Sequence, residues 1–186
     1  EWANIINAFK TFQCIVVWVP FNEAWGQFDT PEVVKFTREL DPTRLINPAS
    51  GGNYDFSAGV EGFGDILDVH HYPCPAMNVF ERKFVNVLGE YGGIGYPVDG
   101  HTWIIERKWG YGKVKESSEE LMKQYEDFLE MLRTFVTNGC AAAVYTQTTD
   151  VEGEVNGLMT YDRKVVKVDM PRIAAANKAV IDSMSR

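Results

Sequence analysis

Two glutamates follow short apolar segments of this sequence, and their placement suggests chemistry that needs a pair of carboxylates. Asn22-Glu23 comes directly after the apolar run 15–21, and Glu90 ends the run 84–90. We expect both runs to be strands because they are short and largely apolar. In parallel α/β folds, ligands bind outside the carboxyl ends of the strands. A pair of glutamates around a shared substrate is the arrangement used to hydrolyse a glycosidic bond.

The rest of the sequence predicts helices that alternate with strands. Helical spacing of apolar residues indicates helices at 2–12, 30–40, 117–138 and 171–184. Thr30 is the expected N-cap of the second helix, and Ser117 with Glu120 forms a capping box for the third. Strands are expected at 15–21, 44–48, 65–71, 84–90 and 140–146, with the first and last fully buried, and a loop at 50–64. This alternation favours a parallel α/β fold, with residues 1–186 forming one domain or part of one.

Three motifs resemble segments of glycoside hydrolase family 2, which contains β-galactosidases, β-glucuronidases and β-mannosidases. Residues 17–26 (Val-Trp-Val-Pro-Phe-Asn-Glu-Ala-Trp-Gly) resemble the acid/base segment of that family. Residues 87–93 (Val-Leu-Gly-Glu-Tyr-Gly-Gly) resemble its nucleophile segment, and 68–73 (Asp-Val-His-His-Tyr-Pro) resemble the strand between them. The motifs occur in the order of the family, and the resemblance runs through the whole chain.

The resemblance implies a retaining, β-galactosidase-like enzyme that hydrolyses O-glycosidic bonds by double displacement. Glu23 matches the residue that protonates the leaving oxygen and then acts as a base, and Glu90 matches the nucleophile. Asn22 matches the residue that holds the sugar 2-hydroxyl, and Tyr72 matches a tyrosine that hydrogen-bonds the nucleophile. Retention predicts carboxyl groups about 5–5.5 Å apart. Apolar neighbours such as Trp25 are expected to raise the pKa of the acid.

Four further residues are candidate substrate contacts: His70, His71, Trp103 and Tyr145. The two histidines alternate faces of one strand, so only one of them can point toward the site. Trp103 lies in a long loop with Trp109 and Tyr111, and these rings either stack on sugars or fill the core of the loop. Tyr145 either lines the sugar pocket or packs in the core.

We expect no metal and no cofactor. The histidines lack further ligands at metal-motif spacing, and the acidic segment 150–154 is more typical of a solvated loop than of a calcium site. The segment 89–93 lacks the glycine pattern of a dinucleotide-binding turn. Cys14, Cys74 and Cys140 are widely spaced and are expected to be buried free thiols.

Charge and hydropathy limit the partners. The chain has 18 basic and 26 acidic residues, a net charge of −8, which argues against binding to nucleic acid or to an anionic membrane surface. No apolar run approaches the ~20 residues that a membrane helix needs. The first residues do not have the pattern of a signal peptide. The expected partner is a carbohydrate substrate, and the family resemblance implies a periplasmic or secreted location.

The family comparison also predicts the fold class. The five expected strands match the fourth to eighth of a (β/α)8 TIM barrel, so the chain is expected to be the C-terminal part of such a barrel. The first three strands and the β-sandwich domains of the family have no counterpart in it. Exposed strand edges would then allow a homodimer, and we expect the chain alone to have little or no activity.

Two other functions fit the same residues. An endo-acting relative of the cellulase or mannanase type would keep the glutamate pair and would have a long open cleft in place of a pocket. A non-catalytic carbohydrate-binding or assembly module would bind sugars through its aromatic rings, with the glutamates idle. Sugar binding that survives Glu90→Ala would favour the module.

Overall fold

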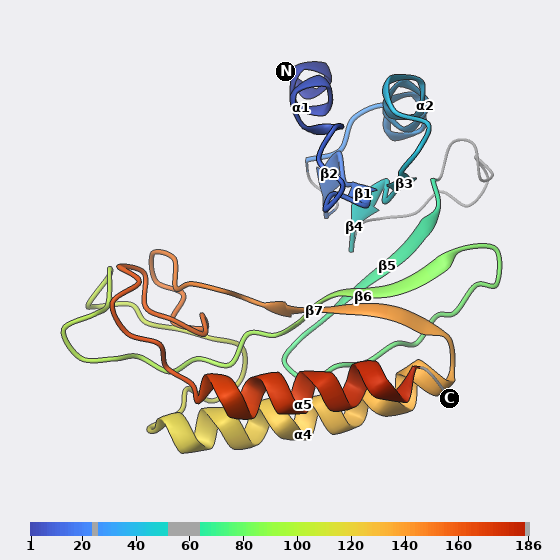
Figure 1. Ribbon diagram of the computed structural model, residues 1–186. Helices are drawn as coiled ribbons and strands as arrows, with labels where there is room; N and C mark the ends of the chain where they lie inside the picture. Colours follow the sequence, from blue (N-terminus) through green and yellow to red (C-terminus); the bar gives the residue numbers. More distant parts are fainter. Residues whose placement is uncertain (24–25, 52–63, 185–186) are drawn as a thin grey trace. The chain divides into compact units, whose positions relative to one another are not determined.

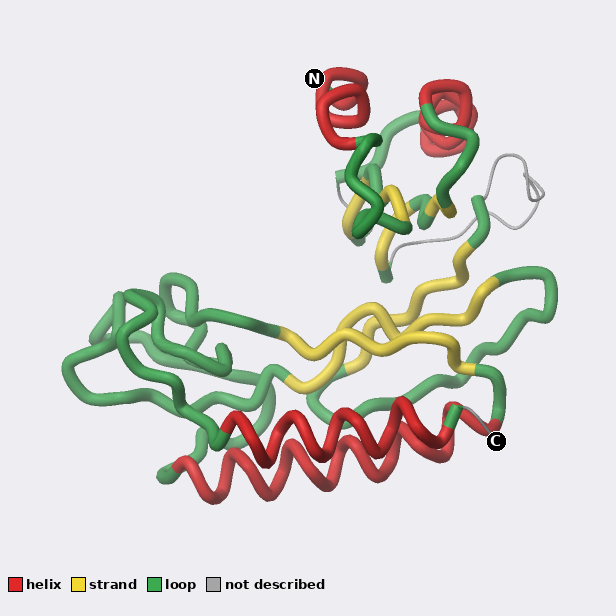
Figure 2. Tube along the Cα trace, viewed as in Figure 1, coloured by secondary structure: helices red, strands yellow, loops and turns green. Residues whose placement is uncertain are grey.

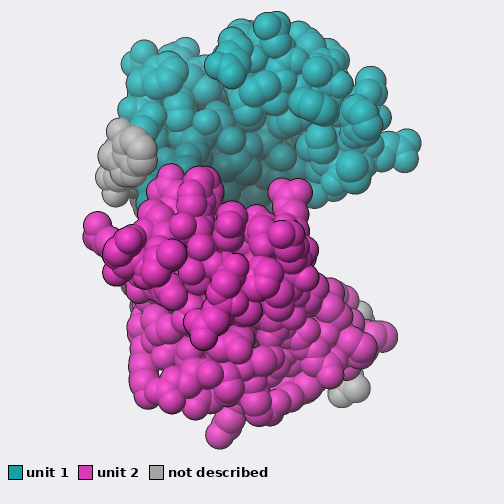
Figure 3. All heavy atoms as spheres, turned by 90° about the vertical axis from the view of Figure 1, so that its left-hand side faces the viewer, with its two compact units in different colours: residues 1–70, 79–89 teal, residues 71–78, 90–186 magenta. Residues whose placement is uncertain are grey.

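The computed structural model describes residues 1–23, 26–51 and 64–184. Most of the predicted loop at 50–64, and Trp25 of the acid/base motif, lie outside these residues. The chain divides into two compact units, residues 1–70 with 79–89 and residues 71–78 with 90–186 (Figure 3). The boundary crosses strand β5 (Ile66–His71) after His70 and strand β6 (Val85–Gly92) after Gly89.

The helices of the first unit are α1 (Trp2–Phe9) and α2 (Thr30–Leu40), labelled in Figure 1. The indole nitrogen of Trp2 donates to Thr37 Oγ1 at 2.9 Å and so joins the two helices. Ile6 and Val34 are fully buried in the core of this unit. Helix α2 has the predicted bounds and a proline in its first turn, but its N-cap is Asp29 in place of Thr30.

The strands of the first unit begin as two short parallel pairs. Strand β1 (Val17–Trp18) pairs with β3 (Leu45–Ile46), and β2 (Phe21–Asn22) pairs with β4 (Ala49–Ser50). The two pairs have the same register. A proline lies between the strands on each side, Pro20 between β1 and β2 and Pro48 between β3 and β4. Proline has no backbone N–H to donate to a ladder. The predicted strand 15–21 is therefore two pieces.

The expectation that residues 15–21 form a fully buried strand is also wrong. Trp18 is buried, but Val16 is 65% exposed and Val19 is 42% exposed. Strands β5 and β6 add Ile66, Leu67, Val87 and Leu88 to the apolar core of this unit. The backbone N–H of Val85 donates to the carbonyl of Asp65 at 2.9 Å, where the two strands begin.

The second unit contains two long helices that lie side by side, α4 (Ser118–Thr137) and α5 (Met170–Ser183) (Figures 1 and 2). Helix α4 starts at Ser117, whose Oγ accepts the backbone N–H of Glu120 at 3.2 Å, as the capping motif predicts. The predicted apolar stripe of α4 is buried at Leu121, Tyr125, Phe128 and Leu132. Tyr125 donates to Asn177 Oδ1 of α5 at 3.0 Å.

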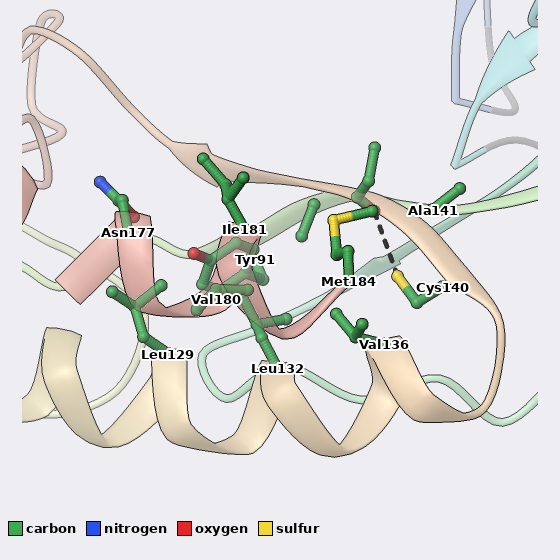
Figure 4. A pocket seen from close by; sticks show the side chains of 12 residues that line it. Tyr91, Leu129, Leu132, Val136, Cys140, Ala141, Asn177, Val180, Ile181 and Met184 are labelled. Carbon is green, nitrogen blue, oxygen red and sulfur yellow. Dashed lines mark hydrogen bonds between the residues drawn. The ribbon is translucent and has the colours of Figure 1, made fainter. Parts of the chain in front are cut away.

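Strand β7 (Cys140–Thr146) follows β5 and β6 in a three-stranded sheet with the order β5-β6-β7. The prediction that β7 is buried is wrong beyond Cys140, because Val144 is 53% exposed. Its place at the edge of the sheet explains this exposure. An apolar cavity of about 450 Å³ lies between β7, α4 and α5, and Tyr91 of β6 also lines it (Figure 4).

The expected partial (β/α)8 TIM barrel is not found. The described strands form three separate sheets of two, two and three strands, and none of these sheets closes. The fold is a small α/β arrangement with short parallel pairs. The prolines that divide the first strands into two-residue pieces remove the long continuous strands that a barrel wall requires.

The expectations about the cysteines and about membrane-spanning helices can be compared with the structure. None of the three cysteines forms a disulfide within the described chain, and of the three only Cys140 is buried, while Cys74 is partly buried and Cys14 is exposed. None of the described helices combines the length and apolar character needed to cross a membrane.

Candidate functional site

Glu23 lies in the first unit directly after β2, and its carboxyl group contacts the imidazole of His70. Glu23 Oε1 is 3.0 Å from His70 Nδ1. The histidine side chain is 7% exposed, whereas the glutamate side chain is 43% exposed. The backbone N–H of Glu23 donates to the carbonyl of Ser50 at 2.9 Å and continues the β2-β4 ladder. The ladder thus holds a solvent-accessible carboxyl group against a buried imidazole.

The other ring nitrogen of His70 begins a chain of hydrogen bonds that ends at a buried carboxylate. His70 Nε2 lies 2.8 Å from Ser50 Oγ, and Ser50 Oγ donates to Asp68 Oδ2 at 2.8 Å. Asp68 is 2% exposed. Within the first unit, the side chains of Asp68, Ser50, His70 and Glu23 therefore form one continuous hydrogen-bonded row.

Asp68 accepts two more hydrogen bonds, from Asn47 Nδ2 to Oδ2 at 2.7 Å and from the backbone N–H of Gly89 to Oδ1 at 2.7 Å. Burial raises the pKa of the Asp68 carboxyl, and the hydrogen bonds from Ser50, Asn47 and Gly89 oppose that rise. A β-carbon at Gly89 would lie 2.1 Å from Asp68 Oδ1. Only glycine therefore lets β6 approach this carboxylate so closely.

Glu90 lies in the second unit, on β6, and its carboxylate has a phenol as partner. The hydroxyl of Tyr72 donates to Glu90 Oε2 and also lies 2.7 Å from Thr146 Oγ1 on β7. Burial, followed by the hydrogen bond to Glu90, raises the pKa of Tyr72 above its ordinary value. The phenol therefore keeps its proton at neutral pH and remains a donor to Glu90.

Aromatic packing holds the Tyr72 ring in place. Tyr111 stacks on Tyr72 with ring centroids 3.7 Å apart, and Trp109 meets Tyr111 edge-on at 5.5 Å. Gly93 has φ +60°, and a β-carbon there would lie 2.3 Å from Tyr111 Cδ2. Tyr111 thus packs against Tyr72 and Trp109, and Trp109 remains 37% exposed.

The remaining candidates have separate surroundings. His71 is exposed, with Nδ1 2.7 Å from the carbonyl oxygen of Cys74, so His70 and not its neighbour is the histidine beside Glu23. Tyr145 Oη accepts the backbone N–H of Ile94 at 3.2 Å, and its ring packs among Tyr91 and Tyr125. Asn22 is exposed at the end of β2. Trp103 is 57% exposed.

The acidic loop differs from the solvated loop that was expected. Asp150 is only 5% exposed and accepts a hydrogen bond from Lys167 Nζ at 2.6 Å. Glu154 Oε2 accepts from Gln147 Nε2 at 2.9 Å and from Asn156 Nδ2 at 3.1 Å. These contacts give the loop a structural interior.

Sequence reasoning missed Ser50, Asp68 and Thr146 as neighbours of the proposed catalytic residues. A signal for Asp68 was present, because it precedes His70 by two positions on one strand and alternate residues share a face. No comparable signal exists for Ser50, whose position depends on how β4 pairs with β2. Thr146 depends in the same way on where β7 ends.

The structure brings together Glu23 with His70 in the first unit and Glu90 with Tyr72 in the second. One carboxyl group lies where it can exchange a proton with an imidazole, and the other accepts a hydrogen bond from a phenol. Comparison with known proteins gives no match: no protein-family model fits this chain, and no curated protein is significantly similar to it.

Proposed function

We propose that this protein is a retaining, β-galactosidase-like glycosidase in which Glu23 is the acid/base and Glu90 the nucleophile. The observation that carries the proposal is the difference between their partners. Glu23 contacts an imidazole at 3.0 Å, and Glu90 accepts a hydrogen bond from a partly buried phenol. An imidazole can exchange a proton with an acid/base, and a phenol donor can orient a nucleophilic carboxylate.

The chemistry needs different properties from each carboxyl group. In the first step Glu90 attacks the anomeric carbon, the bond to the leaving oxygen breaks, and Glu23 gives that oxygen its proton. In the second step Glu23 takes a proton from water, which attacks the same carbon and releases Glu90. The imidazole of His70 can share the proton that Glu23 transfers. The Tyr72 hydroxyl stabilises the ionised nucleophile.

The nucleophile can be tested with 2,4-dinitrophenyl 2-deoxy-2-fluoro-β-galactoside, from which a glycosyl-enzyme accumulates. Turnover by the 186-residue chain is expected to be low, so a label that builds up over hours is the better readout. Peptide mass spectrometry should place the fluorosugar on Glu90, and Glu90→Gln should remain unlabelled. A label on another residue, or equal labelling of Glu90→Gln, would refute the assignment.

The acid/base role has its own test. Dinitrophenolate leaves without protonation, so Glu23→Gln should be labelled at nearly the rate of the unmodified chain. A fluorosugar with a poor, basic leaving group should label the unmodified chain but not Glu23→Gln, because departure of that group needs an acid. Equal sensitivity of both reagents to Glu23→Gln would contradict the role given to Glu23.

A second candidate is sugar binding without catalysis, and one surface feature favours it. Trp103 is 57% exposed and Tyr161 is 41% exposed, and their ring centroids lie 5.9 Å apart with planes at 32°. Beside them, His101 Nδ1 lies 2.9 Å from Asp162 Oδ2. Exposed neighbouring rings can stack on the apolar faces of sugars. Glycan binding lost in Trp103→Ala but retained in Glu90→Gln, without labelling of Glu90, would select this function.

A further inference from the structure

We propose that Asp68 and Ser50 are positioning residues that fix the tautomer of His70 and thereby keep one transferable proton on the Glu23–His70 pair. The inference uses the proposed function only for the role of Glu23. All four side chains belong to the first unit, and the hydrogen bonds between them set the direction of each donor.

The direction is set first at Asp68. The amide nitrogen of Asn47 and the backbone N–H of Gly89 can only donate, and each points at a carboxyl oxygen of Asp68. The reverse orientation of the Asn47 amide would turn its oxygen toward that carboxylate, which also accepts. Asp68 is therefore surrounded by donors, and the hydroxyl proton of Ser50 points toward it at 2.8 Å. A proton on Asp68 would have to reverse Ser50.

Ser50 passes this direction on to His70. A serine hydroxyl has one proton, and the bond to Asp68 uses it. The lone pairs of Ser50 Oγ remain to face His70 Nε2 at 2.8 Å, so Nε2 is the nitrogen that carries hydrogen. The imidazole also packs closely, since a β-carbon at Gly51 would lie 2.1 Å from its Cγ atom.

The last link requires a proton between His70 and Glu23. A neutral imidazole with hydrogen on Nε2 has a bare Nδ1, which can only accept from a protonated Glu23. If both nitrogens carry hydrogen, the imidazolium donates to an ionised Glu23. In both forms the pair holds one proton, which is the state that a group acting first as acid and then as base requires. Asp68 and Glu23 are two carboxyl groups that act on His70 within the first unit.

The experiment is a ¹⁵N NMR titration of the imidazoles in the 186-residue chain. Its three histidines make assignment direct, with His71→Gln and His101→Gln identifying the other two signals. We expect His70 to carry hydrogen on Nε2 at every pH at which the chain is folded. The ¹³C signal of the Glu23 carboxyl should show that a proton is shared between this carboxyl group and the imidazole.

Ser50→Ala removes the acceptor for Nε2–H. We expect the preference for one tautomer to disappear in this variant, because Nε2–H has lost its partner. Ser50→Thr keeps the hydroxyl and should keep the tautomer. Asp68→Asn places an amide N–H donor opposite Ser50 Oγ, so the Ser50 hydroxyl turns to donate to His70 Nε2. The imidazole hydrogen should then move to Nδ1.

The matched control is Thr43→Ala, which removes a hydroxyl that donates to another carboxylate of the first unit, Asp41, at 2.6 Å. Thr43→Ala should leave the tautomer of His70 unchanged. The NMR measurement is repeated in Glu90→Gln to detect any effect of the Glu90 carboxylate on His70. A neutral His70 imidazole with hydrogen on Nδ1 in place of Nε2 in the unmodified chain overturns the inference, and this measurement needs no variant to fold. An unchanged tautomer preference in folded Ser50→Ala also overturns it. Failure to label Glu90 would refute only the proposed function.

Discussion

The ring of Tyr111 lies flat against the ring of Tyr72, with centroids 3.7 Å apart and planes at 9°. The Tyr111 backbone N–H donates to the carbonyl of Gly93 at 2.8 Å, so the stack is tied to the segment that follows β6. Tyr72 in turn donates to Glu90 near the end of the same strand. A loop residue that stacks on Tyr72 thus fixes the donor of that carboxylate.

Gly93→Ala should break this stack. Gly93 has φ +60°, and an added β-carbon would lie 2.3 Å from Tyr111 Cδ2, so the aromatic ring must move. We expect a loss of about 1–3 kcal/mol in the free energy of unfolding and slower fluorosugar labelling of Glu90. Gly100→Ala is the control, because Gly100 has φ +77° with nothing within 4 Å of the added atom. Equal effects of the two changes, by urea unfolding and labelling, would assign the loss to backbone strain alone.

Tyr72→Phe tests the hydrogen bond separately from the ring. The substitution keeps the surface that stacks on Tyr111 and removes the donor to Glu90. Loss of one donor to a reacting charge commonly costs about 10²–10³ in rate, so the labelling rate should fall about 10²-fold or more. Tyr161→Phe, on an exposed tyrosine of the same unit, should leave the rate unchanged. A labelling rate unaffected by Tyr72→Phe would remove the phenol from the mechanism.

Elements whose signals are local could be predicted from the sequence. Helix α2 has its predicted bounds, and α4 begins at Ser117 because a side-chain cap and an apolar stripe are properties of adjacent turns. The strands were predicted less well because their burial depends on distant partners. Pro20 and Pro48 stand at matching positions of two paired segments, and their match becomes visible only when the pairing is known.

The barrel prediction failed for the same reason, since alternating helices and strands do not determine which strands pair or whether a sheet closes. The candidate site shows the same division. Glu23, His70, Tyr72 and Glu90 were proposed from short motifs, and the structure supplies a partner for each. Ser50 reaches His70 only through the register that sets it opposite Asn22. No spacing along the chain encodes that register.

Alkaline pH should ionise some tyrosines only when the chain unfolds. Burial raises the pKa of four of them: Tyr72, Tyr91, Tyr125 and Tyr145. Because the folded chain holds these phenol protons more tightly than the unfolded chain, their contribution to stability is complete below pH ~10, the unfolded value, and is lost as the pH rises above it. Absorbance at ~295 nm should show that these four phenols ionise only as circular dichroism reports unfolding. Ionisation of every tyrosine in a chain that is still folded would contradict this prediction.

Lys167 and Asp150 form a buried ion pair whose loss should be costly. Lys167 Nζ lies 2.6 Å from Asp150 Oδ1, and their side chains are 0% and 3% exposed. Asp150 Oδ2 has no hydrogen-bond partner within the described chain, so no second donor at that oxygen could compensate for loss of the lysine. Lys167→Met leaves a buried carboxylate unpaired and should cost about 3–5 kcal/mol in urea unfolding.

The control for this pair is Lys164→Met, since the Lys164 side chain is 74% exposed and its loss should change stability by less than about 0.5 kcal/mol. Asp150→Asn combined with Lys167→Met removes the unpaired charge and should recover part of the stability lost in the single variant, because the carboxylate and not the missing lysine causes most of the loss. The amide can still accept the backbone N–H of Gly157, which donates to Asp150 Oδ1 at 2.8 Å. If the double variant is as unstable as Lys167→Met alone, the packing of the lysine side chain, and not its charge, stabilises this loop.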